Sequence, residues 1–100
     1  MSVLVDLSPR AHREAERIAR WWRANRQSAP DLFDQELRVA IMRISTAPNS
    51  GIAVRGKRDQ KYRQLMMPAT RTRVYWRMLA PQHARVVAIW SAVRGRGPAL

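Results

Sequence analysis

Residues Ala47-Pro48-Asn49-Ser50-Gly51 divide this chain of 100 residues into two parts with different hydrophobic periods. Proline, asparagine and glycine in close succession end helices and start turns. Before this stretch, apolar residues recur every three or four positions, as on one face of a helix. After it they alternate with polar residues, as in a half-buried strand. The sequence therefore predicts a mainly helical first half and a sheet-forming second half.

Two amphipathic helices are expected before residue 47. Ser8 fits the N-cap of the first, and Pro9 fits its first helical position, where the missing N–H costs nothing. This helix should extend to about Asn25. A polar break at 26–30 leads to a second helix with acidic residues in its first turns, which suits the helix dipole. The apolar stripes of the two helices should be buried: Ala11, Ala15, Ile18, Ala19, Trp22, Phe33, Leu37, Ala40, Ile41 and Ile44.

Alternating residues predict one short strand before the helices and several after them, at 1–7, 52–54, 62–67, 72–79 and 84–93. We expect one α+β domain over residues 1–100, of order β-α-α-β-β-β(β). Its helical hairpin should pack on one face of a mainly antiparallel sheet. Trp76 and Trp90 fall on inward strand positions and should lie in the core, whereas residues 93–100 should form a basic, flexible tail.

Charge is the most informative part of the composition. Nineteen Lys and Arg residues oppose seven Asp and Glu, for a net charge of +12, and seventeen of the nineteen are Arg. Residues 37–100 hold thirteen of the basic residues and one acid, Asp59. A field of this sign attracts polyanions and acidic proteins, and arginine suits bidentate contacts with phosphate and carboxylate. Arginine codons in a GC-rich genome would explain the arginine bias but not its uneven placement.

Several classes of protein are excluded by composition. The chain has no cysteine, which excludes a disulfide scaffold, a thiolate nucleophile and a sulfur-ligated metal site. Its two histidines, His12 and His83, offer little for a metal site. No apolar run is long enough to cross a membrane, and the N-terminus does not resemble a signal peptide. We therefore expect a cytoplasmic protein without cofactor, metal or membrane partner.

Four short sequence motifs, in their order and spacing, resemble those of the RelE/ParE superfamily of bacterial toxins. Val5–Ala11 is similar to the family's "LSPRA" opening, and Ala47–Gly51 to its "x-P-x-x-G" segment after the helices. Thr72–Arg77 is similar to its "YR-x-x-YR" strand, and Ile89–Pro98 to its closing phrase. The resemblance covers residues 3–98. It implies a type II toxin–antitoxin system, in which a stable growth-inhibiting toxin is neutralised by a labile antitoxin.

The superfamily contains two kinds of toxin, which differ in chemistry. ParE-like members inhibit DNA gyrase, trap cleaved DNA and carry no known catalytic residues. RelE-like members cut messenger RNA on the ribosome, and such cleavage needs a base, an acid and cations around the phosphate. Here Met66-Met67-Pro68 stands where a RelE-like arginine is expected, and residues 91–94 contain neither Tyr nor His. The ParE-like branch is therefore favoured, with no catalytic residue. A ribonuclease would depend on Lys57, Lys61, Arg73 and Arg94.

Basic residues of the loop 55–61, the 72–79 strand and the tail are the expected contacts with the target, namely Arg55, Lys57, Arg58, Lys61, Arg73, Arg94 and Arg96. Each has a simpler explanation. The loop would then be only a solvated connection, Arg73 would snorkel or pair with a helix acid such as Glu36, and the tail would be a disordered solubility tail. Trp21, Arg73 and Arg77 are the expected antitoxin contacts, since an exposed tryptophan is a typical anchor.

The antitoxin implied by the resemblance should be acidic and partly disordered, and it should carry the DNA-binding domain that this chain lacks. The other partner is the target, which is DNA gyrase for a ParE-like toxin or the ribosome and its messenger RNA for a RelE-like one. A third alternative is a degenerate member that has lost toxicity and only binds a partner.

Overall fold

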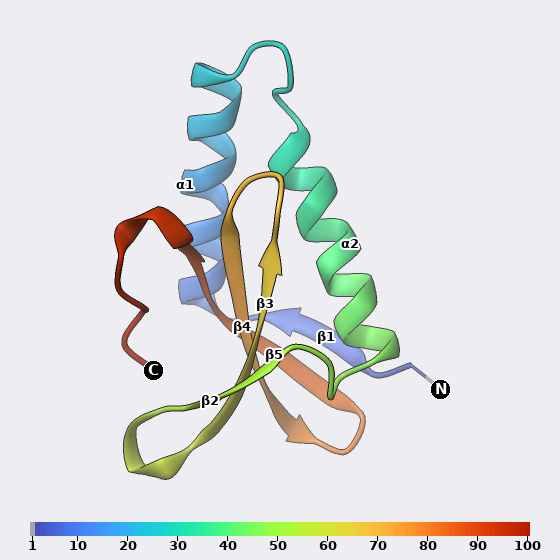
Figure 1. The fold of residues 1–100 in the computed structure, drawn as a ribbon. Coiled ribbons are helices and arrows are strands. Elements are labelled where there is room, and N and C mark those ends of the chain that lie inside the picture. Colours follow the sequence, from blue (N-terminus) through green and yellow to red (C-terminus); the bar gives the residue numbers. More distant parts are fainter. Residues whose placement is uncertain (1) are drawn as a thin grey trace.

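Two helices cover one face of a five-stranded sheet in the computed structural model, which describes residues 2–100 (Figure 1). The strands lie in the order β1-β5-β4-β3-β2; β1 pairs with β5 in parallel, and the other pairs are antiparallel. The α+β prediction is therefore confirmed. The elements are β1 (Leu4–Leu7), α1 (Pro9–Asn25), α2 (Leu32–Thr46), β2 (Ile52–Arg55), β3 (Lys61–Met67), β4 (Thr72–Ala80) and β5 (His83–Ser91).

The ends of the helices follow the predicted local signals. The Ser8 hydroxyl accepts a hydrogen bond from the Ala11 N–H at 3.1 Å, and Pro9 opens α1. After the end of α2, Gly51 has a φ of +77°, and a Cβ there would lie 2.2 Å from the Gln64 carbonyl oxygen. Only glycine fits this turn, which leads the chain from α2 into β2.

The core lies between the helices and the sheet. Phe33 and Ile44 of α2 are buried against Val74 and Trp76 of β4, as their periodicity predicts. The Trp76 indole N–H also donates to the Pro48 carbonyl at 3.1 Å, which ties β4 to the turn after α2. None of the helices within residues 2–100 is long and apolar enough to cross a membrane.

The prediction that Trp90 lies in the core is wrong. Trp76 pairs with Val86, whereas Tyr75 pairs with Ala88, so β5 carries an extra residue between these two pairs. Such a bulge shifts the in-and-out alternation by one position. Ile89 is consequently buried where Trp90 was expected, and Trp90 lies half-buried on the sheet face away from the helices.

Glu14 is a buried carboxylate in α1 that the helical pattern does not predict. Strand β1 pairs with β5 only as far as Val86, so the N–H of Ile89 further along has no strand partner on that side. Glu14 Oε1 accepts this N–H at 2.9 Å, and the Arg10 Nε donates to the other carboxylate oxygen at 3.3 Å. A side chain of α1 therefore completes the edge of β5 where β1 ends.

Residues 93–100 are folded against the sheet, in contrast to the flexible tail expected from the sequence. The Trp90 indole N–H donates to the Arg96 carbonyl at 2.6 Å, and the Arg10 guanidinium donates to the Ala99 carbonyl at 2.6 Å. The Lys57 N–H donates to the Leu100 carbonyl at 3.2 Å. Because Gly97 lies beside the hydroxyl of Tyr75, the tail covers part of the helix-free face, and Tyr75 is buried.

Candidate functional site

The helix-free face of the sheet carries the arginines singled out in β4. Alternation along this strand places Arg73, Tyr75 and Arg77 on the face opposite Val74 and Trp76, which are buried under the helices. Since the tail covers Tyr75, the accessible part of β4 on this face is basic. Arg77 donates to the Gln60 side-chain oxygen at 2.7 Å and so links β4 to the 55–61 loop.

Three of the predicted target contacts adjoin Trp90 through a side chain, the backbone or strand pairing, and we call Arg73, Trp90, Arg94 and Arg96 the Trp90 cluster. Arg73 lies directly opposite Trp90 in the pairing of β4 with β5. The Arg94 guanidinium carbon lies 4.3 Å from the centroid of the Trp90 ring, a cation–π contact. The carbonyl of Arg96 accepts the indole N–H.

The short turn η2 (Ala92–Arg94) positions the last two arginines of the cluster. Ser91 caps it by accepting the Val93 N–H at 3.4 Å, and Gly95 follows with a φ of +75°. None of the three arginines in the cluster has an ion-pair partner within residues 2–100. The cluster is therefore a concentrated positive charge available to an acidic partner.

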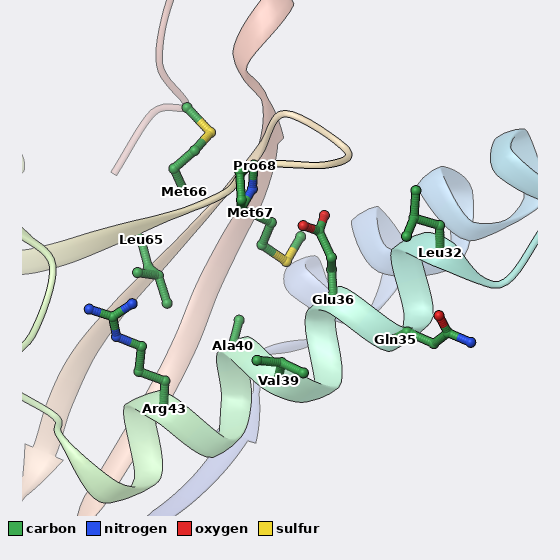
Figure 2. Close-up of a pocket in the computed structure, with 10 residues that line it drawn as sticks. All are labelled: Leu32, Gln35, Glu36, Val39, Ala40, Arg43, Leu65, Met66, Met67 and Pro68. Atoms are coloured by element: carbon green, nitrogen blue, oxygen red, sulfur yellow. The ribbon is translucent and has the colours of Figure 1, made fainter. Parts of the chain in front are cut away.

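The expected alternative of an ion pair between Arg73 and Glu36 is wrong. Both carboxylate oxygens of Glu36 accept hydrogen bonds from the turn between β3 and β4: the Ala69 N–H at 2.8 Å, the Thr70 N–H at 2.9 Å and the Thr70 hydroxyl at 2.7 Å. Figure 2 shows the Glu36 side chain directed from α2 toward this turn. Beside it, Val39, Leu65 and Arg43 line an open groove between α2 and β3.

The basic loop 55–61 is held at several points. Arg55 forms an ion pair with Asp59, and Arg58 and Asp59 both adopt positive φ values, 57° and 61°. The backbone N–H of Lys57 donates a hydrogen bond to the carbonyl of Leu100, at the end of the tail. The tail therefore runs from the Trp90 cluster to this loop and connects the two basic regions.

The four residues on which a ribonuclease would depend do not converge. Met66 is the partner of Arg73 in the β3–β4 pairing, and Lys61 lies five residues before Met66 on the same strand. At about 3.3 Å per residue, the backbones of Lys61 and Arg73 are roughly 16 Å apart along the strand. Arg94 lies over Trp90, the strand partner of Arg73, and therefore belongs with Arg73. Lys57 lies in the loop just before Lys61 and therefore belongs with Lys61.

Trp21 lies on a different surface from the other two predicted antitoxin contacts. It is exposed on α1, with its ring edge-on to Trp22 at a centroid distance of 5.6 Å. Arg73 and Arg77 lie on the helix-free face. The expected antitoxin residues therefore mark two separate surfaces, one beside the helices and one across the sheet.

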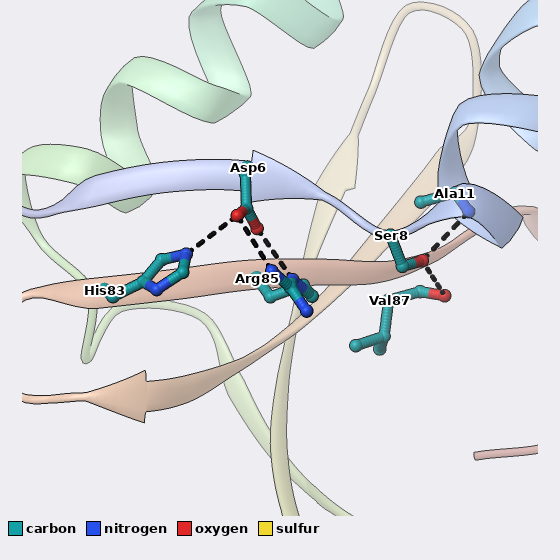
Figure 3. Close-up of polar contacts among 6 residues, drawn as sticks. All are labelled: Asp6, Ser8, Ala11, His83, Arg85 and Val87. Atoms are coloured by element: carbon teal, nitrogen blue, oxygen red, sulfur yellow. Dashed lines mark hydrogen bonds and ion pairs between the residues drawn. The ribbon is translucent and has the colours of Figure 1, made fainter.

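A network of Asp6, His83 and Arg85 was not predicted (Figure 3). The Asp6 carboxylate accepts from Arg85 Nε at 2.8 Å and Nη2 at 3.0 Å, and lies 2.8 Å from His83 Nε2. Hydrogen bonding to Arg85, with His83 adding to it, holds the pKa of Asp6 well below its usual range. These residues are almost 80 positions apart in sequence, so only the parallel pairing of β1 with β5 reveals them.

No group of three or more His, Cys, Asp or Glu side chains within residues 2–100 could hold a metal ion.

Comparison with known proteins places this architecture among the toxins. A solved structure described as "Chromosomal ParDE TA system from P. aeruginosa" superposes with a TM-score of 0.69 over 90% of this chain and 96% of that chain, at 12% sequence identity. The two therefore share a fold. The family model of the "ParE toxin of type II toxin-antitoxin system, parDE" matches residues 5–95. The chain belongs to this ParE toxin family. No curated protein matches the sequence.

Proposed function

We propose that this toxin arrests growth in the cytoplasm by binding and poisoning DNA gyrase, and that a cognate antitoxin neutralises it. The observation that supports this proposal is the Trp90 cluster, whose three arginines have no acidic partner within residues 2–100. The Arg94 guanidinium lies over the Trp90 ring, Arg73 is the partner of Trp90 on β4, and the Arg96 backbone carbonyl accepts the indole N–H. Arginine presents paired N–H donors that match phosphate and carboxylate oxygens. Gyrase with its bound DNA offers both kinds of acceptor.

Poisoning by this route needs no chemistry from the toxin itself. A protein that binds the cleaved gyrase–DNA complex more tightly than the resealed one shifts the equilibrium toward the cleaved state. A hundredfold preference, about 2.7 kcal/mol, would raise the ratio of cleaved to resealed complex a hundredfold. Arginines suit this role because their contacts need only be complementary to one state of the target.

The proposed antitoxin is acidic and folds on the toxin as it binds. The net charge of +12 favours such a partner and speeds encounter with it. A RelE-like ribonuclease is the alternative, but its four candidate residues fall into two groups, Lys57 with Lys61 and Arg73 with Arg94. The backbones of Lys61 and Arg73 are roughly 16 Å apart along the strand direction, which disfavours a common reacting centre.

The test is a supercoiling assay with purified gyrase, relaxed plasmid, ATP and the toxin after its release from the antitoxin. We expect loss of supercoiling and accumulation of linear DNA. Undisturbed supercoiling by toxin that still arrests growth would reject the proposal, and cut messenger RNA on ribosomes would then support the ribonuclease. A folded toxin that leaves growth unchanged would indicate a degenerate, binding-only member.

A further inference from the structure

A second arginine-rich surface lies on the helix side of the molecule, and we call it the α1 groove. Its walls come from α1, the turn between β3 and β4, and η2, and its volume is about 620 Å³. Ile18, Trp21, Trp22 and Val93 form its apolar part. Trp21 is 46% exposed and Val93 73% exposed, so two large apolar side chains face solvent in one concave surface.

Four arginines surround this apolar part: Arg17, Arg26, Arg71 and Arg94. None of them forms an ion pair within residues 2–100, and the groove is lined by no acidic side chain. By contrast, Arg23 lies on α1 outside the groove, and its guanidinium nitrogen is 3.4 Å from a carboxylate oxygen of Asp34. The positive charge of the groove therefore has no acidic partner within the described residues, whereas the neighbouring Arg23 pairs with Asp34.

The aromatic side chains of the groove are arranged for packing rather than for stacking with nucleic-acid bases. Trp21 and Trp22 already meet edge to face, at an interplanar angle of 74°. The Arg26 guanidinium lies 5.3 Å from one ring centroid and 5.9 Å from the other. Base stacking needs a free aromatic face, whereas apolar peptide side chains pack against ring edges and against Val93 equally well.

We infer that the α1 groove is the docking site for an acidic segment of the antitoxin. In this arrangement apolar side chains of the segment contact Trp21 and Val93, and its carboxylates face the four arginines. The inference rests on the proposed antitoxin partner and adds the surface that the antitoxin uses. Charge complementarity supports an acidic occupant, and the exposed apolar part supports a peptide.

Because of Arg94, an antitoxin segment bound in the α1 groove would also affect the Trp90 cluster. It lines the α1 groove and also lies over the Trp90 ring, so one side chain belongs to both surfaces. An antitoxin carboxylate bound to Arg94 would occupy a contact that the Trp90 cluster offers to the target. Antitoxin and target would then compete for the toxin, although most of the helix-free face stays uncovered.

The experiment measures affinity for the antitoxin encoded beside this toxin, by titration calorimetry. The groove variant is Arg17→Glu with Arg71→Glu, which leaves the Trp90 cluster intact. The matched control is Arg13→Glu with Arg38→Glu, two exposed arginines outside the groove with the same change of charge. Melting curves establish that each variant is folded.

We expect the groove variant to lose about 100-fold in affinity or more, as when charged contacts at an interface are reversed, and the control to lose about threefold or less. Trp21→Ala, which changes no charge, should lose about 10- to 100-fold. Equal losses in the groove and control variants would overturn the docking site. So would groove variants that keep antitoxin affinity but lose binding to a single-stranded 20-nucleotide DNA. If the unaltered toxin does not bind the antitoxin at all, the proposed partner itself is wrong.

Discussion

Replacing Glu14 with alanine tests whether a helix side chain completes the edge of β5. The substitution leaves the Ile89 N–H, which Glu14 Oε1 now accepts at 2.9 Å, without a partner beside the buried Ile89 side chain. Such an orphaned donor costs about 1–3 kcal/mol. Removing the carboxylate also relieves the cost of burying it, but the relief is small because Arg10 already pairs with this carboxylate at 3.3 Å. We therefore expect a net loss of about 2 kcal/mol.

Two further variants separate the hydrogen bond from the charge. Glu14→Gln keeps an acceptor for the Ile89 N–H and should lose about 1 kcal/mol, since a neutral acceptor is weaker than a charged one. Glu16→Ala removes an exposed carboxylate two positions further along α1 and should change stability by no more than about 0.5 kcal/mol.

The assay is urea unfolding at neutral pH, combined with hydrogen exchange of the Ile89 amide. A loss of 2 kcal/mol would lower the melting temperature by about 8–16 °C in a domain of this size. The Ile89 amide should be protected in the unaltered protein and exchange much faster in Glu14→Ala. If Glu14→Ala and Glu16→Ala unfold at the same urea concentration, the carboxylate does not support the strand edge and this reasoning is wrong.

Two other substitutions test the turns and the charge network. Gly51→Ala should destabilise the protein by more than Gly95→Ala, because both glycines have positive φ but only a Cβ at 51 collides, at 2.2 Å from the Gln64 carbonyl. Melting temperatures check this, and equal shifts would contradict it. Because the folded-state pKa of Asp6 lies below its unfolded value of about 4, its stabilisation is present above pH 4 and is lost on further acidification. The free energy of unfolding of Asp6→Asn should therefore fall less steeply below about pH 4 than that of the unaltered protein. An equally steep fall in both proteins would refute the role of Arg85 and His83.

Local signals predicted much of the fold because they act over a few residues. The N-cap at Ser8, the breakers at 47–51 and the buried stripe of α2 each depend on neighbours within about one helical turn. The cap and the breakers lie in the structure where these signals indicated. Of the predicted stripe of α2, Phe33, Ala40 and Ile44 are buried, whereas Leu37 and Ile41 are half-buried. Glycine at 51 is a strict requirement of the turn, which sequence alone marks only as a breaker.

Features that depend on pairing between distant segments were missed. The extra residue in β5 moved Trp90 from the core to the helix-free face, since alternation alone does not reveal a bulge. The same reasoning applies to Glu14, which looks like one more surface acid until the end of β1 leaves Ile89 unpaired. Arg73 and Arg94 were each singled out, but only the corrected position of Trp90 brings them together.

The proposal that the Trp90 cluster carries the toxic contact is tested most directly by gyrase inhibition with altered clusters. Arg73→Ala with Arg94→Ala removes two of its three cations, and Arg13→Ala with Arg38→Ala removes the same charge elsewhere. The measurement is the toxin concentration that gives half-maximal linear DNA in the presence of gyrase. We predict an increase of about tenfold or more for the cluster variant and little change for the control. Equal potency of the two folded variants would contradict the assignment of the target contact to the Trp90 cluster.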